Sequence, residues 1–263
     1  MIRCAILDDY QNVALALADW GPLRGRVDVS VFATHIADRD ALAQALAGFE
    51  IVVAMRERTP FDAGLLERLP ALKLLVTTGM RNAAIDMEAA AARGIAVCGT
   101  PGSASSAAEL TWALLLALAR RIPQEVAEFR RGGPWQSTVG IDLIGRRLGV
   151  IGLGNLGGRV ARYGLAFEME VQAWSPRLTE ERCRAVGVGL APSLDALLAE
   201  SDVVTIHAPL NATTRGMIGA RELELMKPGA FLLNTSRGPI VDEAALVEAL
   251  RRGRIAGAGL DVY

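Results

Sequence analysis

Short apolar runs alternate with helical patterns along the whole chain. The first series of runs, expected as strands, covers residues 3–9, 27–32, 50–55, 72–78 and 95–100. The second series covers residues 147–151, 170–174, 203–207, 230–234 and 256–262. Apolar residues at helical spacing lie between them, for example over 39–47 and 86–93. This alternation predicts parallel sheets that are covered by helices on both faces.

The two series predict an α/β fold of two domains, each a doubly wound parallel sheet. The segment TPGSAS is the best candidate for a linker, so we expect domains of residues 1–99 and 100–263. Ser106 and Glu109 have the S-x-x-E spacing of a capping box, which predicts a helix from there to about Arg121. The length of 263 residues fits, because single cores tend to divide at roughly 100–200 residues.

Composition excludes several classes of protein. Hydrophobic residues make up 51% of the chain and charged residues 22%, which excludes intrinsic disorder. A net charge of -1 supplies no field for nucleic acid or anionic lipid, so we expect neither partner. The longest apolar stretch, residues 110–119, is well short of the ~20 residues that a bilayer span needs. The N-terminus does not resemble a secretory signal, which indicates a cytoplasmic protein.

The inventory of catalytic side chains is short. His35 and His207 are the only histidines, and His35 is expected on a surface. Nearly all positive charge is arginine, which binds carboxylates and phosphates but is a poor proton shuttle. The three cysteines are far apart and are expected to be reduced packing residues, so no disulfide or metal site is predicted.

A glycine-rich turn marks the start of the second domain. Gly152, Gly154 and Gly157 have the G-x-G-x-x-G spacing, directly after a predicted strand and at the opening of a predicted helix. In that context the glycines permit a tight turn, close approach of a pyrophosphate and close packing of helix on strand. The turn therefore predicts a dinucleotide site, and S-adenosylmethionine is the competing ligand.

The end of the next predicted strand bears on the choice between NAD and NADP. A carboxylate is normally found there to bind the ribose hydroxyls of NAD, but this chain has Ser175. Arg177 is placed to reach a 2'-phosphate, with a solvated loop charge as the alternative. These residues favour NADP slightly over NAD.

Several segments together resemble the D-isomer-specific 2-hydroxyacid dehydrogenases, in the order and spacing of that family. They are TPGSASSAAELTWALLLALAR, GLGNLG, DVVTIHAPLNATTRGMI, MKPGAFLLNTSRGPIVDEAAL and AGAGLDVY, and ILDDY, Met55-Arg56 and TTGMRNAAID match more loosely. The resemblance implies a flavodoxin-like N-terminal substrate domain and a Rossmann NAD(P)-binding domain, with the active site in the cleft between them. It also implies a small 2-oxo or 2-hydroxy acid as substrate and a homodimer built through the cofactor domain.

The resemblance assigns Arg237 as the catalytic cation that grips the substrate. Chemistry supports this independently, because a guanidinium can hold both the carboxylate and the reacting carbonyl of a 2-oxo acid. Other positions are implied to bind the cofactor: Asn155 and Leu156 at the pyrophosphate, His207, Ala208 and Pro209 in the cofactor wall, and Thr235, Ser236 and Asp261 beside the nicotinamide. The implied substrate loop contains Thr78, Gly79 and Met80, and Arg56 is a further candidate whose alternative is solvated surface.

One departure from the family pattern concerns the proton donor. In the family, a Glu and a later His that pairs with it follow the GLDVY strand, and neither is present here. Only five strands of the cofactor domain are recognisable, so we expect a truncated version of a longer polypeptide that lacks the last strand and the return segment. Such a chain would bind cofactor but reduce substrate poorly. The rival interpretation is a non-catalytic protein of the same fold that senses NAD(H).

Overall fold

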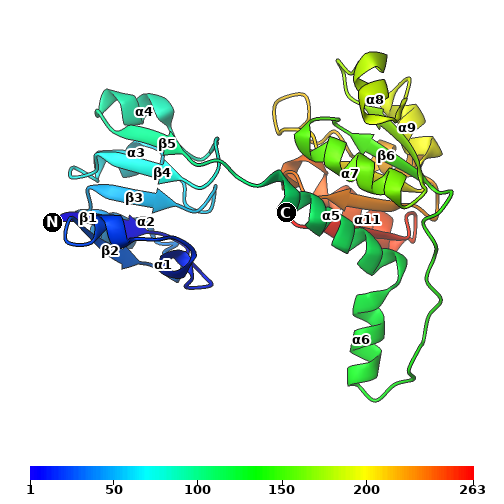
Figure 1. The fold of residues 1–263 in the computed structure, drawn as a ribbon, viewed down its shortest axis with the longest axis horizontal. Helices are drawn as coiled ribbons and strands as arrows, with labels where there is room; N and C mark the ends of the chain where they lie inside the picture. Colours follow the sequence, from blue (N-terminus) through cyan, green and yellow to red (C-terminus); the bar gives the residue numbers. More distant parts are fainter. The chain divides into compact units, whose positions relative to one another are not determined.

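The chain forms two compact units, Met1–Gly102 (unit 1) and Ser103–Tyr263 (unit 2). The structure is a computed structural model that describes residues 1–263, apart from the side chain of Ala104. Each unit is a parallel sheet with helices between its strands, which confirms the predicted α/β fold (Figure 1).

Unit 1 contains a five-stranded sheet in the part of the chain that the structure describes. Its strands are β1 (Ile2–Ile6), β2 (Val27–Val31), β3 (Ile51–Ala54), β4 (Leu74–Thr77) and β5 (Ala96–Gly99). Its helices are α1 (Ala14–Leu17), α2 (Arg39–Leu46), α3 (Ala63–Glu67) and α4 (Met87–Ala92), with a 3-10 turn at Gly21–Leu23. The strand order β2-β1-β3-β4-β5 is the flavodoxin-like order.

Three helices of unit 1 begin at an aspartate that the sequence places directly after a loop. Asp38, Asp62 and Asp86 each accept a hydrogen bond from the backbone N–H three residues later, at 2.8, 3.0 and 2.9 Å. These caps satisfy amides that have no partner within the helix. Behind them, the fully buried Phe61 and Leu66 belong to the core beneath the sheet.

Unit 2 contains a six-stranded sheet among the residues described. Its strands are β6 (Arg147–Ile151), β7 (Glu170–Trp174), β8 (Gly189–Leu190), β9 (Val203–Ile206), β10 (Phe231–Asn234) and β11 (Gly257–Leu260). Its helices are α5 (Ala104–Ala119), α6 (Ile122–Arg130), α7 (Asn155–Ala166), α8 (Glu180–Val186), α9 (Leu194–Glu200), α10 (Ala220–Leu225) and α11 (Glu243–Arg251), with a 3-10 turn, η2, at Gly238–Ile240.

The strand order β11-β10-β9-β6-β7-β8 is the Rossmann order 3-2-1-4-5-6. The sequence analysis counted five strands here, and that count was wrong. It missed β8, which is only two residues long and pairs through Gly189 and Leu190. A strand of two residues is too short to produce a recognisable apolar run.

The helix after the predicted linker begins earlier than expected. Its N-cap is Ser103, whose Oγ accepts from the backbone N–H of Ser105 at 3.3 Å. The predicted capping box was therefore wrong, because Ser106 and Glu109 lie inside α5. The apolar face of α5 packs on the rest of unit 2, where the ring centroids of Trp112 and Phe167 are 5.0 Å apart. No helix in the described residues is long and apolar enough to cross a membrane.

Candidate cofactor and substrate sites

The glycine-rich turn joins β6 to α7, and two of its glycines occupy backbone positions that have no room for a side chain. Gly152 has φ +94°, and a Cβ there would lie 2.8 Å from the carbonyl oxygen of His207. A Cβ on Gly157 would lie 2.0 Å from the carbonyl oxygen of Gly152, whereas one on Gly154 would meet open space. The third glycine thus permits the turn and helix to approach each other.

The N-terminus of α7 faces this turn without a capping side chain. Gly154 is its N-cap, and no side chain of the described residues caps the helix. The amides of Asn155, Leu156 and Gly157 open the helix, and amides at that position have no helical acceptor. Together with the positive end of the helix dipole, they form an arrangement that suits a phosphate group.

A cavity of about 530 Å³ lies beside the turn, and its size is typical of ligand sites. The lining includes seven of the predicted cofactor-binding residues: Gly152, Gly154, Ser175, Arg177, His207, Ala208 and Pro209. It also includes residues that the sequence analysis missed, namely Leu153, Pro176, Leu178, Thr179, Arg182, Asn211, Thr213 and Thr214. The structure therefore gathers residues from the ends of three different strands around one space.

The charge of this cavity is positive. Arg177 and Arg182 line it, and no carboxylate is present among its described lining residues. Nε of Arg182 donates to the carbonyl oxygen of Leu153, in the glycine-rich turn, at 3.4 Å. The available sequence signal for Arg182 was its place near the start of a helix, five residues after Arg177.

His207 borders the same cavity at the end of β9. Its Nε2 lies 2.9 Å from Oγ1 of Thr205, and its Nδ1 is buried with no hydrogen-bond partner among the described residues. Burial lowers the pKa of His207 from 6.5 to about 4, because a charged ring would lose hydration there. The ring is therefore neutral near pH 7, which suits a cofactor wall better than a proton donor.

Asn234, a residue that sequence reasoning missed, organises the turn that carries Arg237. Asn234 is 1% exposed; its Nδ2 donates to the carbonyl oxygen of Arg237 at 3.0 Å, and its Oδ1 accepts from the N–H of Ser236 at 3.0 Å. Its backbone oxygen accepts from the N–H of the exposed Asp261 at 3.1 Å. The Arg237 side chain is half-buried, and its Nη1 donates to the carbonyl oxygen of Ser236 at 2.7 Å.

Two hydroxyls fasten the same turn to its surroundings. Oγ1 of the buried Thr235 lies 2.7 Å from Oγ1 of Thr111 on α5, a further residue that the sequence analysis missed. Oγ of Ser236 donates to the carbonyl oxygen of Ala208 at 2.5 Å. The second contact brings the Arg237 turn next to the predicted cofactor wall.

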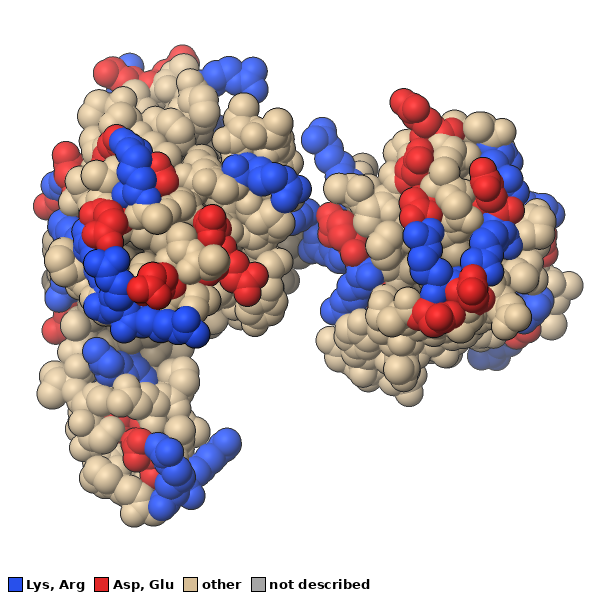
Figure 2. Space-filling view, turned by 180° about the vertical axis from the view of Figure 1, so that it is seen from behind, with Lys and Arg blue, Asp and Glu red and all other residues tan. Residues whose placement is uncertain are grey.

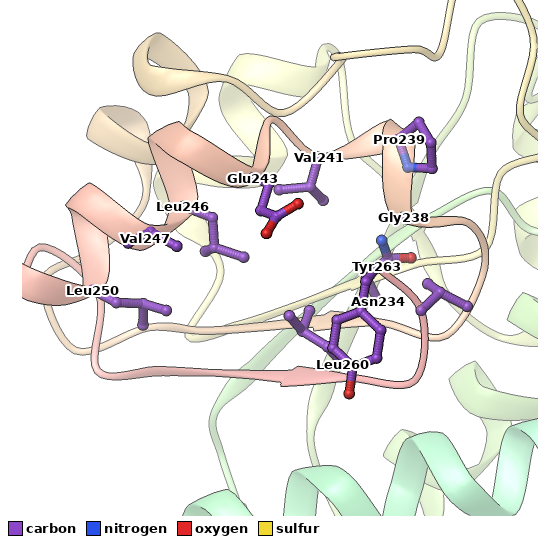
Figure 3. Close-up of a pocket in the computed structure, with 11 residues that line it drawn as sticks. Asn234, Gly238, Pro239, Val241, Glu243, Leu246, Val247, Leu250, Leu260 and Tyr263 are labelled. Carbon is purple, nitrogen blue, oxygen red and sulfur yellow. The ribbon is translucent and has the colours of Figure 1, made fainter.

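A second cavity, of about 360 Å³, lies between η2, α11 and the end of β11 (Figure 3). Leu246 and Leu250 of α11 line one side, and Leu260 and Tyr263 line the other. The backbone of Tyr263 rests directly on Gly238, where a Cβ would collide with it. This cavity was not predicted, and its mostly apolar lining does not suit a dinucleotide.

In unit 1, the structure brings together Arg56, Thr78 and Gly79. The N–H of Arg56 donates to Oγ1 of Thr78 at 3.0 Å, and a Cβ on Gly79 would lie 3.5 Å from Nη1 of Arg56. Gly79 has φ +112°, and its N–H donates to Oγ1 of Thr100 at 3.1 Å. Met80 is 69% exposed beside them. The described residues include no group of three or more His, Cys, Asp or Glu that could hold a metal ion.

Comparison with known proteins identifies relatives of the chain. Residues 112–263 match the family model described as D-isomer specific 2-hydroxyacid dehydrogenase, NAD binding domain. The chain is 42% identical over 228 residues to D-3-phosphoglycerate dehydrogenase of Archaeoglobus fulgidus, covering 86% of this chain and 43% of the relative. It is 43% identical over 212 residues to glyoxylate reductase of Aeropyrum pernix, covering 77% of this chain and 63% of the relative.

A solved structure agrees over the whole chain. The phosphoglycerate oxidoreductase of Vibrio cholerae matches with a TM-score of 0.95 and 36% identity, over 100% of this chain and 84% of that chain. The chain thus spans 43% and 63% of the length of the two curated relatives cited above.

Proposed function

This chain belongs to the D-isomer specific 2-hydroxyacid dehydrogenase family, and we propose that it transfers hydride between a nicotinamide dinucleotide and a small 2-oxo or 2-hydroxy acid. The observation that carries the proposal is the positive cavity at the glycine-rich turn, which lies next to the turn bearing Arg237 through the contact of Ser236 with Ala208.

The residues present fit a dinucleotide. The uncapped amides of Asn155–Gly157 suit a pyrophosphate, and Gly154, which lines the cavity beside them, has open space where its Cβ would be. The unpartnered Nδ1 of His207 supplies a buried polar atom that a ligand can satisfy. When bound, the cofactor would supply or accept the hydride.

Arginines would bind the substrate and stabilise charge, whereas the proton that the carbonyl oxygen takes up would come from water or from the His that the family pattern places after the GLDVY strand. A 2-oxo acid carries a carboxylate beside its carbonyl, so the guanidinium of Arg237 would hold the substrate and stabilise negative charge that develops on the carbonyl oxygen. Within unit 1, we assign Arg56 and the loop of Thr78, Gly79 and Met80 to binding of an acid substrate. Thr235, Ser236 and Asp261 are assigned to the nicotinamide end of the cofactor site.

We further propose NADP(H) as the preferred form of the cofactor. Ser175, Arg177 and Arg182 line the cavity, and two guanidinium groups without a carboxylate among the described lining favour a phosphate monoester over bare ribose hydroxyls. Side-by-side fluorescence titrations of NADPH and NADH test this. Tighter binding of NADH would refute it.

The reaction is tested in a polypeptide in which this chain is followed by a segment carrying the family's Glu and His, with reduced cofactor and glyoxylate or hydroxypyruvate, by following the absorbance of the reduced cofactor. Arg237→Ala should abolish turnover and leave cofactor affinity unchanged, while Arg251→Ala, at an exposed arginine of α11, is the matched control. Cofactor binding by wild type without any turnover would favour the rival NAD(H)-sensing protein. Full activity of Arg237→Ala would contradict the role of that residue.

We also propose a homodimer that forms through α6 and the loop after it. Among the described residues, α6 buries none of its own, and it projects away from the sheet of unit 2 (Figure 1). Val126, Phe129 and Trp135 are 42%, 60% and 83% exposed and line a groove of about 600 Å³. Such an apolar surface is typical of a protein interface, and a second copy presents the same surface for an isologous contact.

Surface charge and the free cysteines give evidence about the cellular compartment of the protein. Lys and Arg side chains are interspersed with Asp and Glu over the face drawn in Figure 2, so this face offers no broad single-sign patch. Cys4, Cys98 and Cys183 are free thiols. Free thiols are typical of a reducing compartment, which supports the proposal of a cytoplasmic enzyme.

A further inference from the structure

Asp8 follows β1 in unit 1 and has two unusual properties. Its side chain is only 2% exposed, and its backbone has φ +56°, in the left-handed region. A residue other than glycine is uncommon in that region, and although aspartate tolerates it better than most, the conformation persists where surrounding contacts hold it. The hydrogen bonds of Asp8 therefore indicate its structural role.

Asp8 makes three side-chain-mediated contacts with later parts of unit 1. Its Oδ1 lies 2.8 Å from Nδ1 of His35, and its Oδ2 accepts from Oγ1 of Thr59 at 2.7 Å. Its backbone oxygen accepts from Nη1 of Arg58 at 2.8 Å. His35 lies in a loop and is exposed, as expected, and its ring contacts this buried carboxylate.

Thr59 and Arg58 belong to the turn after β3, and this turn also carries Arg56. Arg56 is itself in the left-handed region, with φ +53°. On the side away from Asp8, its N–H donates to Thr78 and its carbonyl oxygen accepts from Nδ2 of Asn82 at 2.5 Å. The turn is therefore held between Asp8 and the loop after β4.

We propose that Asp8 is a positioning residue that fixes the turn presenting Arg56 to the carboxylate of the 2-oxo acid. β1 and β3 are parallel neighbours, and the carboxyl ends of such strands are where ligands of α/β sheets bind. His35 orients the carboxylate, and Thr59 and Arg58 transmit its position to Arg56. The substrate part of this inference rests on the proposed function, whereas the anchoring of the turn does not.

The test compares Asp8→Asn with Asp9→Asn in the full chain. Asn tolerates the left-handed conformation and keeps one acceptor, so the change removes charge and one contact with little backbone cost. Asp9 is equally buried at 2% exposed, but its carboxylate accepts from the N–H groups of Val13 and Ala14 at 3.1 and 2.9 Å. It is therefore a matched control that does not touch the turn after β3.

Two readouts are measured for each variant. Hydrogen exchange of the amides in residues 55–59 reports on the turn, and titrations with oxalate and NADPH report on the two ligand sites. We expect Asp8→Asn to speed exchange in this segment about tenfold and to weaken oxalate binding about tenfold, since small misplacements at such sites are costly. NADPH affinity should not change, and Asp9→Asn should alter neither readout.

Thr59→Val provides a second route to the same answer if Asp8→Asn lowers the amount of folded protein. It removes the hydroxyl donor with little change in shape and should move both readouts in the same direction. Wild-type exchange and oxalate affinity in both Asp8→Asn and Thr59→Val would overturn the proposal, as would equal effects in Asp9→Asn. If wild type binds NADPH but neither oxalate nor any 2-oxo acid, the proposed function fails, and the exchange comparison still decides whether Asp8 anchors the turn.

Discussion

Gly157→Ala offers a direct test of the glycine-rich turn because its neighbour provides the control. The new Cβ would lie 2.0 Å from the carbonyl oxygen of Gly152 and 3.3 Å from Cβ of His207. The first contact is with backbone, so either α7 or the turn must move. By contrast, a Cβ on Gly158, the next residue of the same helix, meets nothing within 4 Å.

Forced overpacking of this kind costs about 1–3 kcal/mol of unfolding free energy. For a unit of this size, each kcal/mol lowers the melting temperature by about 2–4 °C, so we expect a decrease of roughly 2–12 °C. Since the displaced turn is the one that faces the pyrophosphate, dinucleotide affinity should fall at least about tenfold, equal to ~1.4 kcal/mol. Gly158→Ala should instead stabilise the helix by about 0.5–1 kcal/mol, because glycine loses more backbone freedom on folding.

Thermal unfolding followed by calorimetry and a fluorescence titration with NADPH measure both effects. The reasoning is refuted if Gly157→Ala melts and binds like wild type. It is equally refuted if Gly158→Ala impairs binding as strongly, because the loss would then not depend on the contact with Gly152.

Further predictions concern the 2'-phosphate of NADPH, the buried His207 and the apolar surface of α6 and the loop after it. Arg177→Gln should weaken NADPH binding about tenfold, because a charge-assisted hydrogen bond is lost, and should leave NADH binding unchanged. Parallel titrations measure both affinities, and an equal loss of NADPH and NADH affinity would contradict this role of Arg177. The pKa of His207 is about 4 in the folded state and 6.5 in the unfolded state. The neutral ring therefore makes its full contribution to the free energy of unfolding above pH 6.5, and this contribution is lost as the pH falls toward 4. This loss should reach about 3 kcal/mol in wild type and be absent in His207→Gln. Denaturant unfolding at several pH values measures it, and identical pH curves for wild type and His207→Gln would show that burial of His207 is not its cause. Phe129→Glu combined with Trp135→Glu should convert a dimer into folded monomers in sedimentation experiments. An unchanged mass would exclude the surface of α6 and its following loop as the interface.

The sequence determined the architecture where local physical constraints are strong. Apolar runs separated by helical patterns gave the two parallel sheets because strand and helix periodicities differ clearly over several residues. The turn at Gly152 was predictable because its spacing, preceding strand and following helix all agree. The two-residue β8 and the start of α5 were not, because a short strand has no periodicity and two serines compete to cap the same helix.

Only the tertiary structure decided which polar groups meet. Thr111 and Thr235 are 124 residues apart, and Asp8 lies 51 residues before Thr59, yet each pair shares a hydrogen bond. The contact of Arg182 with Leu153 likewise joins two elements that are 29 residues apart. No pattern along the chain encodes such pairs, because packing of whole elements sets the distances between them, and burial then makes each hydrogen bond necessary.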